Sequence, residues 1–246
     1  MSSQHESQLA RLQKLGDGQL LRLRIRDLKL KVAGSLIEPK IYKLYDELEA
    51  QSIRFRPHIY FGDEWFSPEG MLAIAIPFYL AHPRLMLLEH RQMGEVEGSD
   101  PEYFMRLMRH EAGHCFDHAY RFSRRREWHK LFGSPKKEYA PEEYRPVPSS
   151  RKYVANLDDH YAQAHPDEDF AETFATWLNP KSNWRKKYAR WPVALAKLRY
   201  VDWIVKESRQ KMPNPSATGY LPCSASRLRI TLEKYYGRRK KRKRAE

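Results

Sequence analysis

The chain has 246 residues with 45 Lys and Arg against 31 Asp and Glu, which gives a formal net charge of +14. Hydrophobic residues make up 41% of the sequence and aromatic residues 13%, enough to bury a sizeable core and too many for a wholly disordered chain. No stretch approaches about 18 consecutive apolar residues, which argues against a transmembrane helix. The first residues lack the apolar segment of a secretory signal, so we expect a cytoplasmic protein.

Half of the net charge lies in one run close to the C-terminus. The sequence RRKKRKR occupies residues 238–244 and carries seven positive charges. Like charges in a block repel one another, so we expect residues 238–246 to form a disordered basic tail beside one folded domain over residues 1–237. Such a tail can make a weak electrostatic contact with nucleic acid or another polyanion, although no aromatic residues interleave with it to stack on bases.

The first third of the chain has mainly strand-like patterns. Apolar and basic residues alternate over Leu20–Val32, and this period of two predicts a strand. Arg54–Phe61, Met71–Leu80 and Leu85–Glu89 are predicted to be further strands. Between them, Pro39–Gln51 places its apolar residues on one stripe and is predicted to be a helix.

Three longer helices are predicted in the second half. The first begins at Ser99-Asp100-Pro101-Glu102, which combines capping-box spacing with a proline in the first turn, and runs to about Phe122. The second begins at Pro166 and ends before Asn179-Pro180, and the third covers Pro192–Ser208. The proline-rich residues 132–152 form a long irregular connection. Strands followed by helices are typical of an α+β fold.

The first of these helices contains the pattern HExxH, formed by His110, Glu111 and His114. Residues four apart share one helix face, so both imidazoles can reach one ion. Zinc is suited to two imidazoles and a carboxylate, with a fourth position open to water. Glu111 projects in a neighbouring direction, where it can take a proton from the attacking water. The alternative is a helix whose histidines only decorate a partly buried face.

Such a zinc site needs a third protein ligand. Glu168 and Glu172 are again four residues apart on one helix face. One of them can bind the metal while the other accepts a hydrogen bond from a ligand histidine. Ala171 and Ala175 lie beside them and allow another helix to approach closely, which argues against the alternative of two acids on a solvated face.

These segments together resemble a known group of metalloenzymes. A helical HExxH, an ExxAE segment about fifty residues later and Tyr161 seven residues before Glu168 are similar to the gluzincin arrangement of anthrax lethal factor and the Pro-Pro endopeptidases. The stretch YAQAHPDEDFAETFATWL resembles bacterial families of zinc-binding metallopeptidases, and this resemblance extends over most of residues 20–205.

The resemblance implies a role for each matching residue. The zinc ligands would be His110, His114 and Glu168, with Glu111 as general base, Tyr161 as hydrogen-bond donor to the oxyanion or the bound water, and Glu172 as a carboxylate behind the ligands.

Other residues compete for these roles. Asp117 extends the motif to HExxHxxD, but an acid three residues after His114 on one continuous helix cannot easily close a tetrahedral shell, so we favour Glu168. His118 stands where many gluzincins carry an aspartate that orients a ligand histidine. We expect it beside the site rather than on the ion.

Two further groups of side chains are less specific. His160 and His165 flank Tyr161, and either could touch a substrate. Arg121 and the residues 124–126 form a basic cluster beyond the HExxH helix, which is either a solvated face or a pocket for an acidic substrate side chain.

We therefore expect an α+β, zincin-like fold in which a twisted sheet packs on the HExxH helix and the C-terminal part is mainly helical. The expected function is zinc-dependent hydrolysis of peptide bonds in a peptide or protein substrate, with no membrane contact. The substrate would add as a strand to an edge formed by Met71–Leu80 or Leu85–Glu89. The alternative is a catalytically silent binding or regulatory protein on the same scaffold, tethered to nucleic acid by the basic tail.

Overall fold

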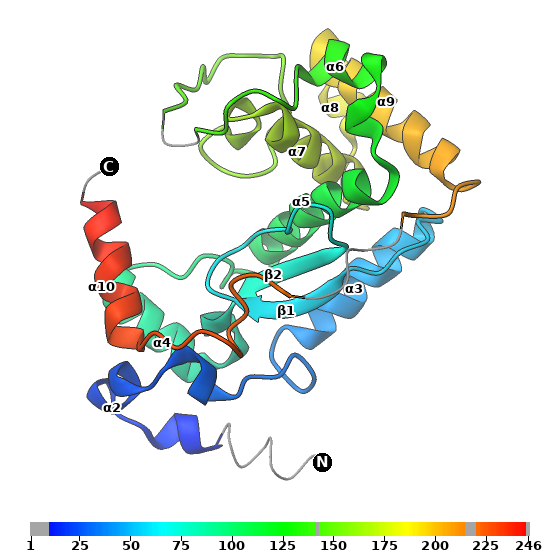
Figure 1. Cartoon of the computed structure of the whole chain (residues 1–246). Coiled ribbons are helices and arrows are strands. Elements are labelled where there is room, and N and C mark those ends of the chain that lie inside the picture. Colours follow the sequence, from blue (N-terminus) through cyan, green and yellow to red (C-terminus); the bar gives the residue numbers. More distant parts are fainter. Residues whose placement is uncertain (1–9, 141–142, 215–219, 245–246) are drawn as a thin grey trace.

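A two-stranded parallel sheet lies against helix α5 (Pro101–Tyr120), and helix α7 (Pro166–Leu178) packs on the other side of α5 (Figure 1). The computed structural model describes residues 10–140, 143–214 and 220–244. Within these ranges the architecture is rich in helices and has one small sheet, which is compatible with the α+β class. No helix within them is both long and apolar enough to cross a membrane.

The remaining elements surround this central layer. Their bounds are α2 Asp17–Arg22, η1 Ile25–Leu28, α3 Glu38–Ala50, η2 Phe78–Ala81, α4 Pro83–Met93, η3 Phe122–Arg124, α6 Arg126–Phe132, η4 Tyr161–Gln163, α8 Trp184–Lys187, α9 Pro192–Ser208 and α10 Leu232–Lys243, where η denotes a 3-10 helix. Helices α6, α8 and α9 gather around α7, whereas α2, α4 and α10 lie together beyond the other end of α5 (Figure 1).

The sheet consists of β1 (His58–Gly62) and β2 (Ala73–Pro77), in parallel register with His58 opposite Ala73. All five residues of β2 are buried, which fits a short, wholly apolar strand. The outer edge of β2 is partly covered, because the Ala75 amide donates a hydrogen bond of 2.9 Å to the Phe66 carbonyl. Phe66 and Ala75 thus form an antiparallel bridge next to the parallel pair.

The prediction of a strand over Leu20–Val32 is wrong. Two short helical turns, α2 and η1, occupy this segment, and Leu20, Ile25 and Leu28 are buried from them. The turn η1 ends at Lys29, whose φ of 48° is left-handed. The basic residues between them lie on short helical turns and face solvent. The alternation of apolar and basic residues therefore marks which side chains are buried, and the backbone itself is not extended.

Leu85–Glu89 is also helical instead of extended, as part of α4. His82 caps α4 by accepting a hydrogen bond of 3.1 Å from the Arg84 amide, and Pro83 occupies the first turn. Leu85, Leu88 and Glu89 are buried from this helix at the helical spacing of three and four residues. A short apolar run does not distinguish a strand from a buried helix, and here the N-terminal cap decides.

The other predicted helices agree closely with the structure. The predicted helix over Pro39–Gln51 is α3, and the helix predicted from Ser99 begins at Pro101, with Asp100 accepting hydrogen bonds from two amides of the first turn. The helices predicted at Pro166 and Pro192 begin at those residues. The strands predicted over residues 54–61 and 71–80 are shortened to β1 and β2, and residues 78–81 of the latter form η2.

The expected disordered tail is wrong for residues 238–244, since residues 238–243 continue helix α10 and Arg244 caps it; residues 245–246 lie outside the described part. Three of its cations bind partners on or just after α4: Arg239 reaches Glu89 at 2.6 Å, Lys240 reaches Gln92 at 2.7 Å and Lys243 reaches Glu95 at 3.1 Å. Glu89 and Glu95 neutralise two cations of the run, and Gln92 accepts a hydrogen bond from a third, which the sequence pattern alone did not reveal. Because three cations are used within the chain, contact with nucleic acid gains no support from this arrangement.

Candidate metal centre and active-site cleft

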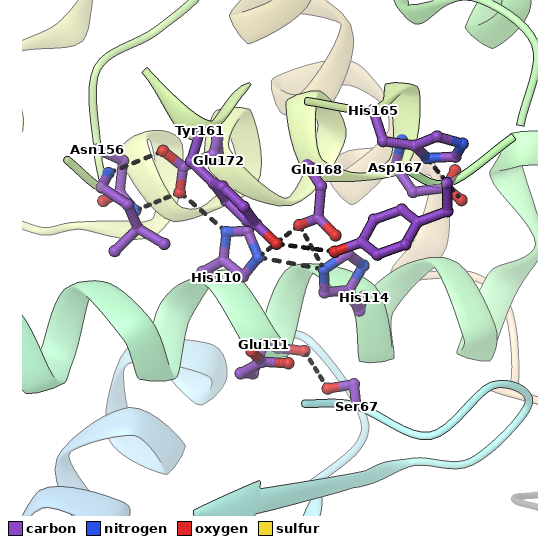
Figure 2. A network of polar contacts seen from close by, with 12 residues as sticks. Ser67, His110, Glu111, His114, Asn156, Tyr161, His165, Asp167, Glu168 and Glu172 are labelled. Atoms are coloured by element: carbon purple, nitrogen blue, oxygen red, sulfur yellow. Dashed lines mark hydrogen bonds and ion pairs between the residues drawn. The ribbon is translucent and has the colours of Figure 1, made fainter. Parts of the chain in front are cut away.

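Helices α5 and α7 approach each other at Gly113. A Cβ atom built on Gly113 would lie 2.9 Å from the Cα of Ala171, closer than real Cβ atoms approach other atoms. The small side chain of Ala171 and the missing one of Gly113 therefore let the two backbones meet, as the alanine edge of α7 predicted. This contact brings the histidines of α5 to the carboxylates of α7 (Figure 2).

His110, His114 and Glu168 form a tight group in which each residue offers one ligand atom, all within 4.8 Å of one another. The Nε2 atom of His110 lies 2.9 Å from Oε2 of Glu168 and 3.2 Å from Nε2 of His114. His114 Nε2 lies 3.3 Å from the same Glu168 oxygen. Figure 2 shows the three side chains pointing to one place between the helices.

Glu172 stands behind His110. Its Oε1 atom lies 2.8 Å from Nδ1 of His110 and accepts a hydrogen bond of 2.8 Å from the Asn156 amide, while Oε2 accepts one of 2.7 Å from the Leu157 main chain. Glu172 is fully buried, so its carboxylate relies on these donors. For the contact with Glu172, a neutral His110 ring must carry its proton on Nδ1. The lone pair on Nε2 then faces His114 and Glu168.

The donor set fits a zinc ion. When Nε2 is unprotonated in both His110 and His114, two imidazole lone pairs and a carboxylate oxygen converge, and acceptors alone repel unless a cation lies among them. A tetrahedral zinc site with ligand distances of about 2.0–2.1 Å places its ligand atoms about 3.3 Å apart. The three separations of 2.9, 3.2 and 3.3 Å match that spacing.

The electrostatics of this group also favour a cation. Burial disfavours the charged forms of His110 and His114, but hydrogen bonds and charge from Glu168 outweigh it and raise the pKa of both histidines, that of His110 with further help from Glu172. Burial likewise disfavours the Glu168 carboxylate, yet the two histidines hold its pKa well below the ordinary value. Without a metal, protons bound to the histidines supply the positive charge that an ion would otherwise bring to this group.

Glu111 lies on the neighbouring side of α5, towards Ser67 (Figure 2). Its side chain is 5% exposed, and its Oε2 atom has no hydrogen-bond partner among the described residues. Ser67 donates a hydrogen bond of 2.9 Å to the main-chain oxygen of Glu111. Burial is the main reason why the pKa of the Glu111 carboxyl is raised. A buried carboxylate with a free oxygen and a raised pKa has the properties of a proton acceptor.

Tyr161 leans over the group from η4. Its ring centre lies 5.7 Å from that of His110, and its hydroxyl lies 2.9 Å from the hydroxyl of Tyr139. Burial raises the pKa of Tyr161, so the phenol stays protonated and can donate. Asp159 and His160, just before it, have left-handed φ angles of 56° and 55°. Such backbone strain outside glycine is costly and is often found where a functional side chain must be aimed.

Tyr139, through its hydroxyl, and Asn156, through its side-chain amide, contact site residues, and the sequence analysis did not identify either of them. Tyr139 lies in the proline-rich connection, and Asn156 lies in the irregular segment before η4. Neither segment has a periodic pattern, and no fixed spacing ties either residue to HExxH. Only the chain path around α7 brings them to Glu172 and Tyr161.

The rival metal ligands are engaged elsewhere. The carboxylate of Asp117 accepts two hydrogen bonds from Ser123, at 2.7 Å from the amide and 2.5 Å from the hydroxyl. His118 Nδ1 lies 3.1 Å from the Met71 carbonyl oxygen. The structure therefore groups Glu168, and not Asp117, with the two histidines of the motif.

The less specific candidates also have structural partners. His165 caps α7 by accepting a hydrogen bond of 3.2 Å from the Asp167 amide, and its other ring nitrogen lies 2.9 Å from the Lys137 carbonyl. In the arginine cluster, Arg125 forms a two-pronged ion pair with Glu207, at 2.8 and 2.6 Å. Neither His160 nor any arginine of the cluster lines the cavity described next.

A cavity of about 650 Å³ opens over this group. It is lined by Glu64, Trp65, Phe66, Ser67, Glu97, Tyr103, Leu107, His110, Glu111, His114, Tyr139, Tyr144, Leu157, Asp158, Asp159, Tyr161 and Glu168. The cavity thus combines the three converging ligand atoms, the free oxygen of Glu111 and the hydroxyl of Tyr161 in one substrate-sized space.

The fold and this group define a helical HExxH site with a glutamate supplied by a second helix. Residues 102–190, which include both helices, match the model of the family described as "Putative zinc-binding metallo-peptidase". This match covers somewhat more than a third of the chain and confirms the resemblance predicted from the motifs over that segment. No curated protein and no solved structure matches the chain significantly.

Proposed function

We propose that this protein is a zinc-dependent peptidase in which His110, His114 and Glu168 hold the ion. The observation that carries the proposal is the convergence of their three ligand atoms at separations of 2.9 to 3.3 Å beside a cavity of about 650 Å³. The match of residues 102–190 to a zinc-binding metallopeptidase family supports the same assignment.

A bound zinc ion would supply Lewis-acid polarisation of the scissile carbonyl and a lowered pKa for water. Glu111 accepts the proton of the attacking water and passes it to the leaving amine. Its Oε2 atom is buried and unpartnered within the described residues, and its raised pKa brings the carboxyl closer to the range in which it can both take and return a proton.

Tyr161 donates its hydroxyl proton in a hydrogen bond to the carbonyl oxygen as negative charge develops there. The raised pKa keeps the phenol in its donor form at neutral pH. Tyr139 orients this hydroxyl through the 2.9 Å contact between the two oxygens. Glu172 holds the ring of His110 through Nδ1, which leaves the Nε2 lone pair free for an ion that this group would hold.

We further propose that the substrate binds in an extended conformation beside the candidate metal centre, as in zincins. The edge against which it lies differs from the one expected from the sequence. Leu85–Glu89 is helical and cannot supply the strand edge, and Phe66 covers part of the outer edge of β2. Residues 64–67 line the cavity, with Phe66 bridged to Ala75 of β2 and Ser67 hydrogen-bonded to the main chain of Glu111. The substrate backbone would therefore lie along this segment rather than on β2 itself.

The experiment is hydrolysis of an unbiased peptide library by the zinc-loaded full chain, compared with Glu111→Gln. Metal-dependent cleavage by the wild type that is abolished in Glu111→Gln is the expected result. Zinc binding without any cleavage would favour the catalytically silent scaffold, and cleavage that survives both chelation and Glu111→Gln would overturn the proposal.

A further inference from the structure

The cavity is acidic although the protein is strongly basic. Six carboxylates line it, and no Lys or Arg does, in a chain with a net charge of +14. Glu111 and Glu168 belong to the candidate centre. The other four, Glu64, Glu97, Asp158 and Asp159, are exposed to solvent and lie away from the converging ligand atoms.

These four carboxylates are nearly free of ion pairs within the chain. Among the described residues, only Asp158 forms an ion pair, in which the Arg106 guanidinium lies 3.7 Å away, while Arg239 of α10 attracts Glu64 and Glu97 from a longer distance. By contrast, Glu89 in α4 and Glu95 just after it are paired with cations of α10. The cavity therefore keeps a negative charge that is only partly compensated, whereas the acids around α4 are paired.

The acids come from two segments at the rim of the cavity. Glu64 precedes the residues that contact β2, and Glu97 precedes Gly98, where an added Cβ would lie 3.1 Å from the Trp65 ring, so these two loops pack together. Asp158 and Asp159 belong to the other segment, three and two residues before Tyr161. A peptide whose backbone lies along residues 64–67 in this cavity can therefore meet carboxylates from both segments.

Two independent features show that the cavity is built for a ligand. The buried Oε2 atom of Glu111 lacks a partner in the described part of the chain, and Glu111 lines this cavity. Aromatic side chains line the same cavity as the carboxylates, among them Trp65, Tyr103 and Tyr144. Aromatic faces beside carboxylates favour organic cations, because cation–π attraction adds to the ionic one.

We propose that this cleft selects peptide segments that carry Lys or Arg close to the scissile bond. The proposal rests on the peptidase function above and names its substrate class. Asp158 and Asp159 form one position for such a cation, and Glu64 and Glu97 form another. The overall charge of +14 predicts the opposite preference, for acidic peptides, so the two explanations are separable.

The test measures binding apart from turnover. Zinc-loaded, full-length Glu111→Gln protein is titrated against three peptides of equal length that carry an uncharged dye and differ only in having Lys, Gln or Glu at the same positions. Fluorescence anisotropy gives the Kd at low and at physiological salt. We expect the Lys peptide to bind about tenfold more tightly than the Gln peptide, the Glu peptide to bind least, and salt to reduce the preference.

Paired neutral substitutions locate the effect. Asp158→Asn with Asp159→Asn, and Glu64→Gln with Glu97→Gln, should each weaken binding of the Lys peptide by roughly two- to tenfold and leave the Gln peptide unchanged. Asparagine tolerates the left-handed φ of Asp159, so the rim should keep its conformation. Glu127→Gln with Glu233→Gln, at exposed acids outside the cavity, is the matched control and should change nothing.

The outcomes separate this proposal from the peptidase function. Equal binding of the Lys and Gln peptides, tighter binding of the Glu peptide, or equal losses in the control variant would overturn the acidic cleft. If the wild type cleaves peptides without preference for Lys or Arg, the peptidase function stands and the cleft proposal fails. If cationic peptides bind as described but none is cleaved, the cleft proposal holds and the peptidase function fails.

Discussion

The Nδ1 atom of His110 lies 2.8 Å from the Oε1 atom of Glu172, a buried carboxylate that also accepts hydrogen bonds from Asn156 and Leu157. This contact joins α5 to α7 directly behind the candidate metal centre. It decides which nitrogen of His110 carries the proton, and thereby which nitrogen is left to bind an ion.

Replacing Glu172 with Gln should weaken zinc binding about 10- to 100-fold. The substituted amide must present its NH2 group to at least one of the three donors that now surround the carboxylate, which disturbs His110. A competition titration with a zinc chelator measures the affinity. Asp117→Asn is the control, since Asp117 contacts Ser123 instead of the centre, and its zinc affinity should equal that of the wild type. Equal affinity in Glu172→Gln would contradict the role of the carboxylate.

Tyr161→Phe should lower kcat by roughly 10²–10³ and change KM much less, because a hydrogen bond to the developing oxyanion forms mainly in the transition state. Zinc content and the folded state should be unchanged. Tyr139→Phe should have a smaller effect, since this hydroxyl acts through its 2.9 Å contact with Tyr161. Steady-state kinetics on a cleaved peptide measure both variants. A wild-type kcat in Tyr161→Phe would eliminate the role without affecting the metal ligands.

Gly113→Ala should destabilise the protein by about 1–2 kcal/mol and weaken zinc binding. The added methyl group meets the Ala171 backbone at 2.9 Å and pushes α7, with Glu168, away from α5; this overpacking outweighs the gain of about 1 kcal/mol in helix propensity. Gly237→Ala in α10 is the matched control, because nothing lies within 4 Å of its added Cβ. That variant should be stabilised by about 0.5–1 kcal/mol in urea unfolding. A stabilised Gly113→Ala protein would show that the two helices are not in close contact there.

Arg239→Met should destabilise the protein by about 2 kcal/mol at neutral pH, because the side chain of Glu89 is only 1% exposed and loses its cation. Burial already raises the pKa of Glu89 above its ordinary 4.5, with Arg239 opposing the shift. Without Arg239 the pKa rises further, so the native variant is penalised at pH values above that raised pKa.

The difference in stability between wild type and Arg239→Met should therefore shrink as the pH falls from 7 through the raised pKa towards 4.5, where the carboxyl is protonated in both proteins. Urea unfolding across this range measures it. Arg238→Met, at an exposed residue of the same run, should differ from the wild type by less than about 0.5 kcal/mol at every pH. A deficit that grows on acidification would contradict this account of Glu89.

The parts of the fold that the sequence predicted correctly are those with local signals. The N-terminal ends of helices α5, α7 and α9 are predicted by Asp100, Pro166 and Pro192. Within α5 and α7, helical spacing alone predicts which side chains of HExxH and ExxAE share a face. The cap at His82 is also local, but the apolar run after it was short enough to suggest a strand.

The parts that could not be predicted depend on contacts between distant segments. Residues 20–32 are short helical turns because they pack against the chain near Thr231, and residues 238–244 form a helix because Glu89 and Glu95 neutralise one of its faces. Asn156 and Tyr139 reach the candidate centre through irregular chain paths. No spacing in the sequence encodes such encounters.

The metal content of the purified full chain tests the central claim most directly. Elemental analysis should find one zinc per chain in the wild type and in Glu111→Gln, because a general base is not a ligand. The zinc content should fall at least about tenfold in His110→Ala, His114→Ala and Glu168→Ala, while their helical content is retained. Full zinc occupancy in Glu168→Ala, or zinc lost from Asp117→Asn instead, would contradict the assignment of His110, His114 and Glu168 as the metal site.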